Sequence, residues 1–292
     1  MNYLSKLNSQ ANPENALKYI SQDHYEKFHL KFIKWALSVH SKSSNIGCWG
    51  ESGRYPLFYE ACKLAIDYYT RLKNTNNKLL SAAFKEQVAL DLPWYKNLSK
   101  LLDKYKPTTE INPKIKLSCI ISNNMRIEFV DMWNSAKATS PKLEFYHLIK
   151  TNFQPEKYLS IINVPDFRKN LTKLRISSHN LYVERGRYQI PYVSRENRWC
   201  VHCFYNLGTK YIEDETHVLV NCPLYSTTRK KFDFHPYDKK SLVDLLSNPN
   251  PSLPQILPIA RAIYEILSIN KNYTTYYQNY ETYLSKGRCI LL

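Results

Sequence analysis

The chain has 292 residues, of which 43% are hydrophobic and 23% are charged. This length and composition allow one or two globular domains, and they exclude a disulfide-rich mini-protein and a disordered tail. Lysine and arginine (41) outnumber aspartate and glutamate (25), which gives a formal net charge of +16. Together with 24 tyrosines, this excess favours a polyanionic partner, because cations neutralise phosphates and aromatic rings stack on bases. The alternative explanation is lysine used for solubility in an A+T-biased genome.

The N-terminal residues contain no basic segment leading into an apolar stretch, so we expect no secretory signal. No run approaches the roughly 18 apolar residues that a membrane helix needs. We therefore expect a nuclear or cytoplasmic protein that is not secreted and has no membrane partner. In a reducing compartment, seven cysteines favour metal ligation or burial over a disulfide framework.

The first hundred residues predict a helical domain. A capping box at Asp23 and aromatic residues at helical intervals up to Trp35 predict one amphipathic helix over residues 21–40. Further helices are expected over residues 56–72 and 79–90. Between these helices, three glycines predict a turn-rich stretch, at Gly47, Gly50 and Gly53.

The remainder of the chain also predicts helices, over residues 123–136, 141–150 and 165–178 and in the tail from Ser241. Period-2 alternation is scarce, and residues 188–193 are the main strand candidate. The predicted fold class is therefore mainly α: a helical N-terminal domain, a small unit with little β, and a C-terminal helical tail.

The sharpest motif is C-x2-C-x13-H-x4-C, formed by Cys200, Cys203, His217 and Cys222. A CxxC turn places two thiolates on a tight knuckle, and a later His and Cys complete a tetrahedron around zinc. Four such ligands fill the coordination sphere, so the spacing predicts one structural Zn²⁺ with no open position for a catalytic water. Three alternatives compete: a redox CxxC pair, buried cysteines without a metal, and His202 in place of His217.

Two prolines within seven residues predict a linker over residues 107–118, after a helical domain of residues 1–106. Residues 119–240 then form a helical and basic segment that contains the knuckle, at about residues 195–225. Residues 241–292 form the C-terminal tail.

The segment directly before the knuckle is strongly basic. Residues 168–198, called the basic segment below, contain eight lysines and arginines and only two glutamates, a net charge of +6. Arginine binds phosphates through two parallel hydrogen bonds, and nearby tyrosines offer surfaces for stacking. The alternative is a solvated basic face without a ligand. The nucleic-acid contacts are expected at Arg175, His179, Arg185, Arg187, Arg195 and Arg198.

Several segments resemble a known family: residues 171–181 and 184–187, the Cys/His motif with residues 222–225, and more loosely residues 34–45, 49–56 and 92–95. They are similar to the C-terminal region of non-LTR (LINE-type) retrotransposon reverse transcriptases, a helical thumb or linker followed by a CCHC zinc knuckle. The similarity covers most of residues 25–270. It implies that Cys200, Cys203, His217 and Cys222 are zinc ligands. It also implies that the module binds RNA or DNA, beside a reverse transcriptase core, in support of target-primed reverse transcription.

No convincing catalytic motif accompanies these features. A polymerase needs paired metal-binding carboxylates, but the sequence has no adjacent Asp-Asp pair. Asp166 is the only seed of a nuclease motif and is better explained as a helix-start residue. We therefore expect no catalytic residue, no enzymatic activity of this chain alone and no small-molecule substrate, although the family's complete proteins are RNA-directed DNA polymerases. The alternative function is a protein-interaction or scaffold module that docks on a polymerase, with a purely structural zinc.

Overall fold

The structure, a computed structural model, describes residues 13–105 and 116–285. These residues are mainly helical, as predicted, and the only β-pairing among them is an isolated antiparallel bridge between Trp199 and Ile212. None of the described helices combines the length and the hydrophobicity needed to cross a membrane. The chain divides into two compact units: Met1–Phe32 with Arg54–Thr139, and Ile33–Gly53 with Ser140–Leu292.

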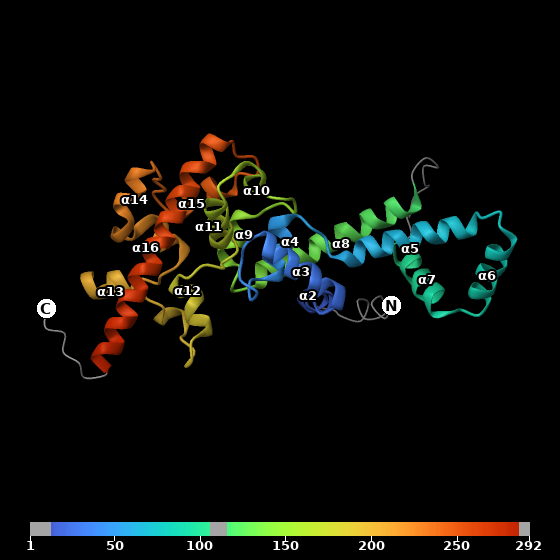
Figure 1. Cartoon of the computed structure of the whole chain (residues 1–292), viewed down its shortest axis with the longest axis horizontal. Coiled ribbons are helices and arrows are strands. Elements are labelled where there is room, and N and C mark those ends of the chain that lie inside the picture. Colours follow the sequence, from blue (N-terminus) through green and yellow to red (C-terminus); the bar gives the residue numbers. More distant parts are fainter. Residues whose placement is uncertain (1–12, 106–115, 286–292) are drawn as a thin grey trace. The chain divides into compact units, whose positions relative to one another are not determined.

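The first unit is built around two helices, α5 (Leu57–Lys73) and α8 (Leu117–Thr139), which run side by side (Figure 1). Every fourth residue of α8 from Ile121 to Trp133 is apolar, and these residues form a buried face of the helix. Phe129 on that face meets Tyr59 of α5 in an edge-to-face contact, with ring centroids 5.4 Å apart. The other helices of this unit are α2 (Pro13–Ser21), α6 (Lys78–Ala89) and α7 (Pro93–Tyr105).

Helix α3 (His24–Ala36) begins where the capping residue was predicted, because the Asp23 carboxylate accepts hydrogen bonds from two backbone N–H groups of its first turn. The predicted single helix over residues 21–40 is shorter than expected. Its aromatic stripe is also on the opposite side from the prediction, since Tyr25, Phe28 and Trp35 have exposed side chains. The buried face is carried instead by Leu30, Ile33 and Leu37.

The predicted turn-rich stretch is a helix, α4 (Asn45–Ser52), in which Gly47 and Gly50 are helical residues. Only Gly53 has the expected role. It ends α4 in the left-handed conformation, with φ of 61°, and a Cβ atom there would lie 2.3 Å from Cδ of Pro155.

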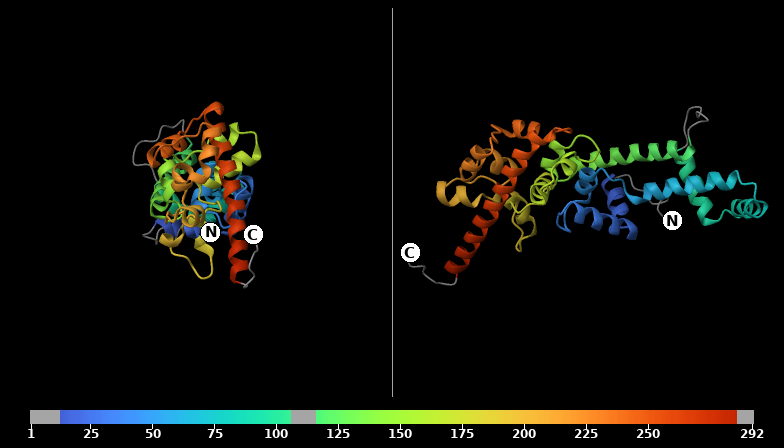
Figure 2. Two further views of the ribbon diagram at one scale, coloured as in Figure 1. Left: turned by 90° about the vertical axis from the view of Figure 1, so that its left-hand side faces the viewer. Right: turned by 45° about the horizontal axis from the view of Figure 1, so that its top comes forward.

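The second unit is organised along α16 (Leu253–Ser285), the red helix in Figure 2. Helices α11 (Pro165–Arg175) and α14 (Ser226–Lys231) pack against it. The strand expected over residues 188–193 does not form, because this stretch follows a 3-10 turn and finds no partner strand. The remaining helical elements of this unit are α9 (Glu144–Ile149), α10 (Tyr158–Ile161), α12 (Tyr182–Arg185), η1 (Gly186–Tyr188), η2 (Arg195–Asn197), α13 (Val201–Leu207), η3 (His217–Asn221), η4 (Pro223–Tyr225) and α15 (Lys239–Ser247).

The two units do not follow the predicted divisions of the chain at residues 106, 118 and 240. Most of the predicted linker, residues 107–115, lies outside the described residues, and residues 117 and 118 begin α8. Helix α8 belongs to the first unit because its apolar face packs on α5. Residues 33–53 and the C-terminal tail both belong to the second unit.

Candidate metal centre and basic segment

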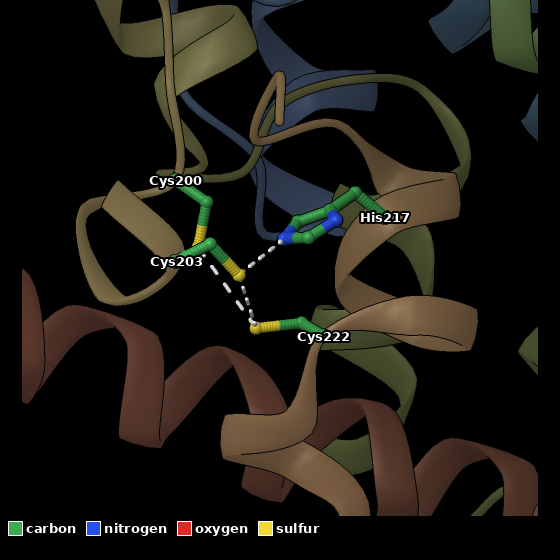
Figure 3. A group of neighbouring side chains, drawn as sticks. All are labelled: Cys200, Cys203, His217 and Cys222. Atoms are coloured by element: carbon green, nitrogen blue, oxygen red, sulfur yellow. Dashed lines mark hydrogen bonds between the residues drawn. The ribbon is translucent and has the colours of Figure 1, made fainter. Parts of the chain in front are cut away.

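The four residues of the Cys/His motif converge on one point in the second unit (Figure 3). One ligand atom from each lies within 4.8 Å of all the others, and all four residues are buried. The Cys222 sulfur is 3.9 Å from the sulfurs of both Cys200 and Cys203, and the Cys203 sulfur is 3.4 Å from Nε2 of His217. Tetrahedral zinc with bonds of about 2.3 Å to sulfur would place two sulfurs about 3.8 Å apart. The donor set therefore fits a tetrahedral metal ion.

All three cysteines are free, so no disulfide joins the CxxC pair in this structure. Their ionisation is uneven. The hydrogen bond with the Cys222 thiol lowers the pKa of Cys200 to about 4, whereas burial raises the pKa of Cys203 to about 11. Packed thiols cannot all ionise together unless a cation balances their charge, and a divalent ion would do so.

Short local elements position the ligands. Cys200 caps α13 and Cys203 lies in its first turn, so the CxxC spacing places both sulfurs at the start of one short helix. The bridge between Trp199 and Ile212 returns the chain to that point, with a 2.7 Å hydrogen bond from the N–H of Cys200 to the carbonyl oxygen of Tyr211. The π-helical turn η3 then begins at His217 and ends at Asn221, directly before Cys222.

Three consecutive acidic residues fasten the return segment of the motif. Glu213 accepts a 2.7 Å hydrogen bond from the side-chain amide of Asn270 in α16. Asp214 accepts one of 2.8 Å from the backbone N–H of His217, at the start of η3. Glu215 pairs with His179 at 2.8 Å. Each carboxylate thus binds a different part of the unit, and together they hold His217 toward the three cysteines.

His202, the alternative ligand, has another partner. Its Nδ1 lies 3.2 Å from the hydroxyl of Tyr273 in α16, and the two rings pack edge to face. The structure therefore brings His217, and not His202, to the three sulfurs. Tyr211 stacks on the His217 ring, with centroids 5.3 Å apart, which restricts the orientation of that ring.

The structure corrects the prediction that Arg175 contacts nucleic acid, because only 2% of this residue is exposed. Its Nε donates a 2.7 Å hydrogen bond to Glu51, and its Nη2 lies 3.0 Å from Glu156. Lys150 reaches the same Glu156 carboxylate, at 2.5 Å. Arg175 is therefore the centre of a buried ion network that joins α4, α11 and the segment after α9.

His179 and Arg198 are corrected in the same way, with exposures of 5% and 1%. The Nδ1 of His179 accepts from a backbone N–H, so its Nε2 carries the proton and donates to Glu215. The guanidinium of Arg198 donates to the carbonyl oxygens of Val183 and Val193 and so holds the intervening loop. Both residues position backbone and are inaccessible to a nucleic acid.

The other three predicted contact residues keep solvent access. Arg195 is exposed and pairs with Glu144 at 2.6 Å. Arg187 is half-buried and donates to a carbonyl oxygen while its Nε lies 2.9 Å from Glu184. Arg185 is half-buried over the ring of Tyr182. These three residues are the part of the predicted contact set that the fold leaves available.

The acidic partners of the buried cations were not predicted from the sequence. Glu51 lies in the stretch expected to be a turn, and Glu156 follows the distant α9, so neither has a local pattern that points to Arg175. Glu51 lies in a helix close to Trp49 and Cys48, and both of these residues are buried. This position is the only signal of an interior carboxylate.

Comparisons with known proteins do not extend these observations, since no protein-family model, no curated protein and no solved structure matches the chain.

Proposed function

We propose that this chain is a non-catalytic nucleic-acid-binding module whose Cys200, Cys203, His217 and Cys222 hold one structural zinc ion. The observation that supports it is the closed set of donors in the unit that also carries the basic segment. Three sulfurs and one imidazole nitrogen in a tetrahedron are typical of structural zinc, whereas oxygen ligands suit magnesium or calcium.

The resemblance to non-LTR reverse transcriptases gives the proposal its wider form. In it, the module is the C-terminal part of a reverse transcriptase and holds template RNA or target DNA during target-primed reverse transcription, beside a polymerase core. The four protein ligands leave no coordination position for water, which suits a zinc ion that only maintains the fold.

Two measurements on the purified full-length chain test this function. Atomic emission is expected to find one zinc per chain, and zinc at background would contradict the metal assignment. Titration of labelled single-stranded and duplex oligonucleotides across a salt series is expected to give a negative slope of log K against log salt. Each phosphate contact contributes about −0.9 for duplex DNA and about −0.7 for a single strand.

The second candidate is a scaffold that docks on a protein. It is favoured by the exposed aromatic side chains of Tyr25, Phe28 and Trp35 along α3, since large exposed apolar side chains that gather on one face mark interaction surfaces. This candidate predicts one zinc per chain but no nucleic-acid binding even at about 50 mM salt.

A further inference from the structure

A basic pocket in the second unit joins Arg185 of the predicted contact set to lysines that lie outside that set. It has a volume of about 420 Å³, within the roughly 300–1,000 Å³ usual for ligand sites. Its walls come from four separate stretches of the chain: the loop before α4, the loop before α9, helix α11 with the residues after it, and α12 with η1. Ser43 and Ser178 join two of these stretches through a 2.6 Å hydrogen bond between their hydroxyls. The pocket is therefore formed by the fold and not by one flexible loop.

The charges in this pocket are unbalanced. Four cationic side chains line it, from Lys42, Lys142, Lys173 and Arg185, against the single carboxylate of Glu184. That carboxylate is already engaged by Lys142 within the pocket and by a neighbouring arginine. Among the described residues, Lys42, Lys173 and Arg185 form no ion pair, and the carboxylates that act on Arg185 and Lys173 from a longer distance, Glu213 and Asp166, do not line the pocket.

Two of these cations are also partly desolvated. The Nε of Arg185 is buried and has no hydrogen-bond partner among the described residues. Burial lowers the pKa of Arg185, and burial together with Lys169 and Lys271 lowers the pKa of Lys173. An anion in the pocket would offset the positive charge that gathers around Lys173 and Arg185.

An aromatic ring completes the pocket. The ring of Tyr188 is half-exposed, and Nζ of Lys42 and of Lys142 lie 5.5 and 5.3 Å from its centroid. The Tyr188 hydroxyl also accepts a 2.9 Å hydrogen bond from Lys142. A cationic cluster beside an exposed ring is the arrangement with which proteins hold one phosphate and stack the adjoining base of a single strand.

The geometry points to a phosphate subsite for single-stranded nucleic acid, in which Lys42, Lys173 and Arg185 bind one backbone phosphate and Tyr188 stacks on the neighbouring base. This inference rests on the proposed function and names where in the module the strand is held. A duplex fits it less well, because paired bases are already stacked and cannot reach the ring.

The test compares two double variants of the full chain that remove the same charge. Lys42→Gln with Lys173→Gln alters the pocket, whereas Lys157→Gln with Lys240→Gln alters exposed lysines of the same unit outside it. Binding of a labelled 12-nucleotide poly(U) or poly(dT) strand is followed by fluorescence anisotropy across a salt series. The pocket variant is expected to lose roughly tenfold in affinity near 100 mM salt, and its log–log slope should shrink by about 0.7, the contribution of one phosphate contact on a single strand. The control variant should keep most of the wild-type affinity.

A second pair of variants tests the stacking. Tyr188→Leu is expected to weaken poly(U) binding roughly tenfold, while Tyr192→Leu, an exposed tyrosine of the same loop outside the pocket, should leave it nearly unchanged. Zinc content and thermal unfolding of every variant should match the wild type, so that a loss of binding is not a loss of fold.

The outcomes separate the inference from the proposed function. Equal weakening by the pocket and control lysine variants would overturn the subsite and leave nucleic-acid binding intact. Binding of uridine monophosphate or inorganic phosphate as tight as that of the strand would also overturn it, in favour of a small-anion site. A wild-type chain that binds no oligonucleotide at about 50 mM salt would overturn the proposed function itself.

Discussion

The metal centre and the basic segment are neighbours in the sequence, but their predictions had different outcomes. All four predicted ligands of the metal centre meet at one point, whereas three of the six predicted contact residues of the basic segment are buried. Ligand spacing is a local property, because a CxxC turn and a returning His and Cys can assemble within about twenty-five residues. Solvent exposure is not local, because it depends on which distant segments cover a side chain.

The largest effect is expected from loss of a metal ligand. Cys203→Ser removes a donor from a closed site, and structural zinc contributes on the order of 10 kcal/mol to small zinc domains. In the proposed function, the variant should bind no zinc and should unfold around residues 198–225, measured by atomic emission and by hydrogen exchange. The control is Cys119→Ser, which replaces an exposed free cysteine of α8 and should change neither readout. If Cys203→Ser keeps one zinc and its protection from hydrogen exchange, Cys203 is not a ligand. The predicted metal ligands would then be no better supported than the predicted contact residues of the basic segment.

The next effect concerns the buried ion network. Glu51→Gln leaves the buried guanidinium of Arg175 without its nearest counter-charge, and breaking a buried pair in this way costs about 3–5 kcal/mol. Urea unfolding measures the change. The matched control is Glu144→Gln, which breaks the exposed pair with Arg195 and should cost no more than about 1 kcal/mol. Equal costs for the two variants would show that Arg175 is not the structural residue that its burial indicates.

A smaller effect is expected where the chain makes room for a buried arginine. Gly186 has an ordinary helical backbone, but a Cβ atom there would lie 2.8 Å from Cδ and Nε of Arg198. Arg198 cannot move away cheaply, because its guanidinium is held by two carbonyl oxygens. Gly186→Ala should therefore destabilise the chain by about 1–3 kcal/mol in thermal unfolding.

Gly208→Ala is the comparison. It places a Cβ atom in open space at φ of 66°, so only the backbone strain of about 1 kcal/mol is expected. A cost for Gly186→Ala no greater than that of Gly208→Ala would contradict the packing argument.

The smallest effect belongs to the exposed part of the basic segment. Arg195→Gln should change the free energy of unfolding by less than about 0.5 kcal/mol, since its pair with Glu144 is solvent-exposed. In the proposed function it removes one phosphate contact, so the slope of log K against log salt should shrink by about 0.7 for a single strand. An unchanged slope would place Arg195 among the residues that do not touch nucleic acid.

The sequence by itself determined the features that short-range geometry controls. The helices at residues 79–90 and 165–178 were predicted from apolar period and from proline and capping residues, and the structure has them within a few residues. The convergence of Cys200, Cys203, His217 and Cys222, which could hold a metal ion, follows from spacing in the same way. The mainly α fold class is the sum of such local preferences.

Only the tertiary structure decided which faces meet and which charges are covered. Helix α8 packs back on α5, so the chain divides elsewhere than at the predicted linker. Arg175 is buried because Glu51, more than a hundred residues earlier, supplies a carboxylate, and a lone arginine could not be desolvated without one. The basic pocket likewise draws Lys42 and Lys173 from segments far apart in the sequence. Positions such as these are set by long-range contacts, which no local pattern of residues encodes.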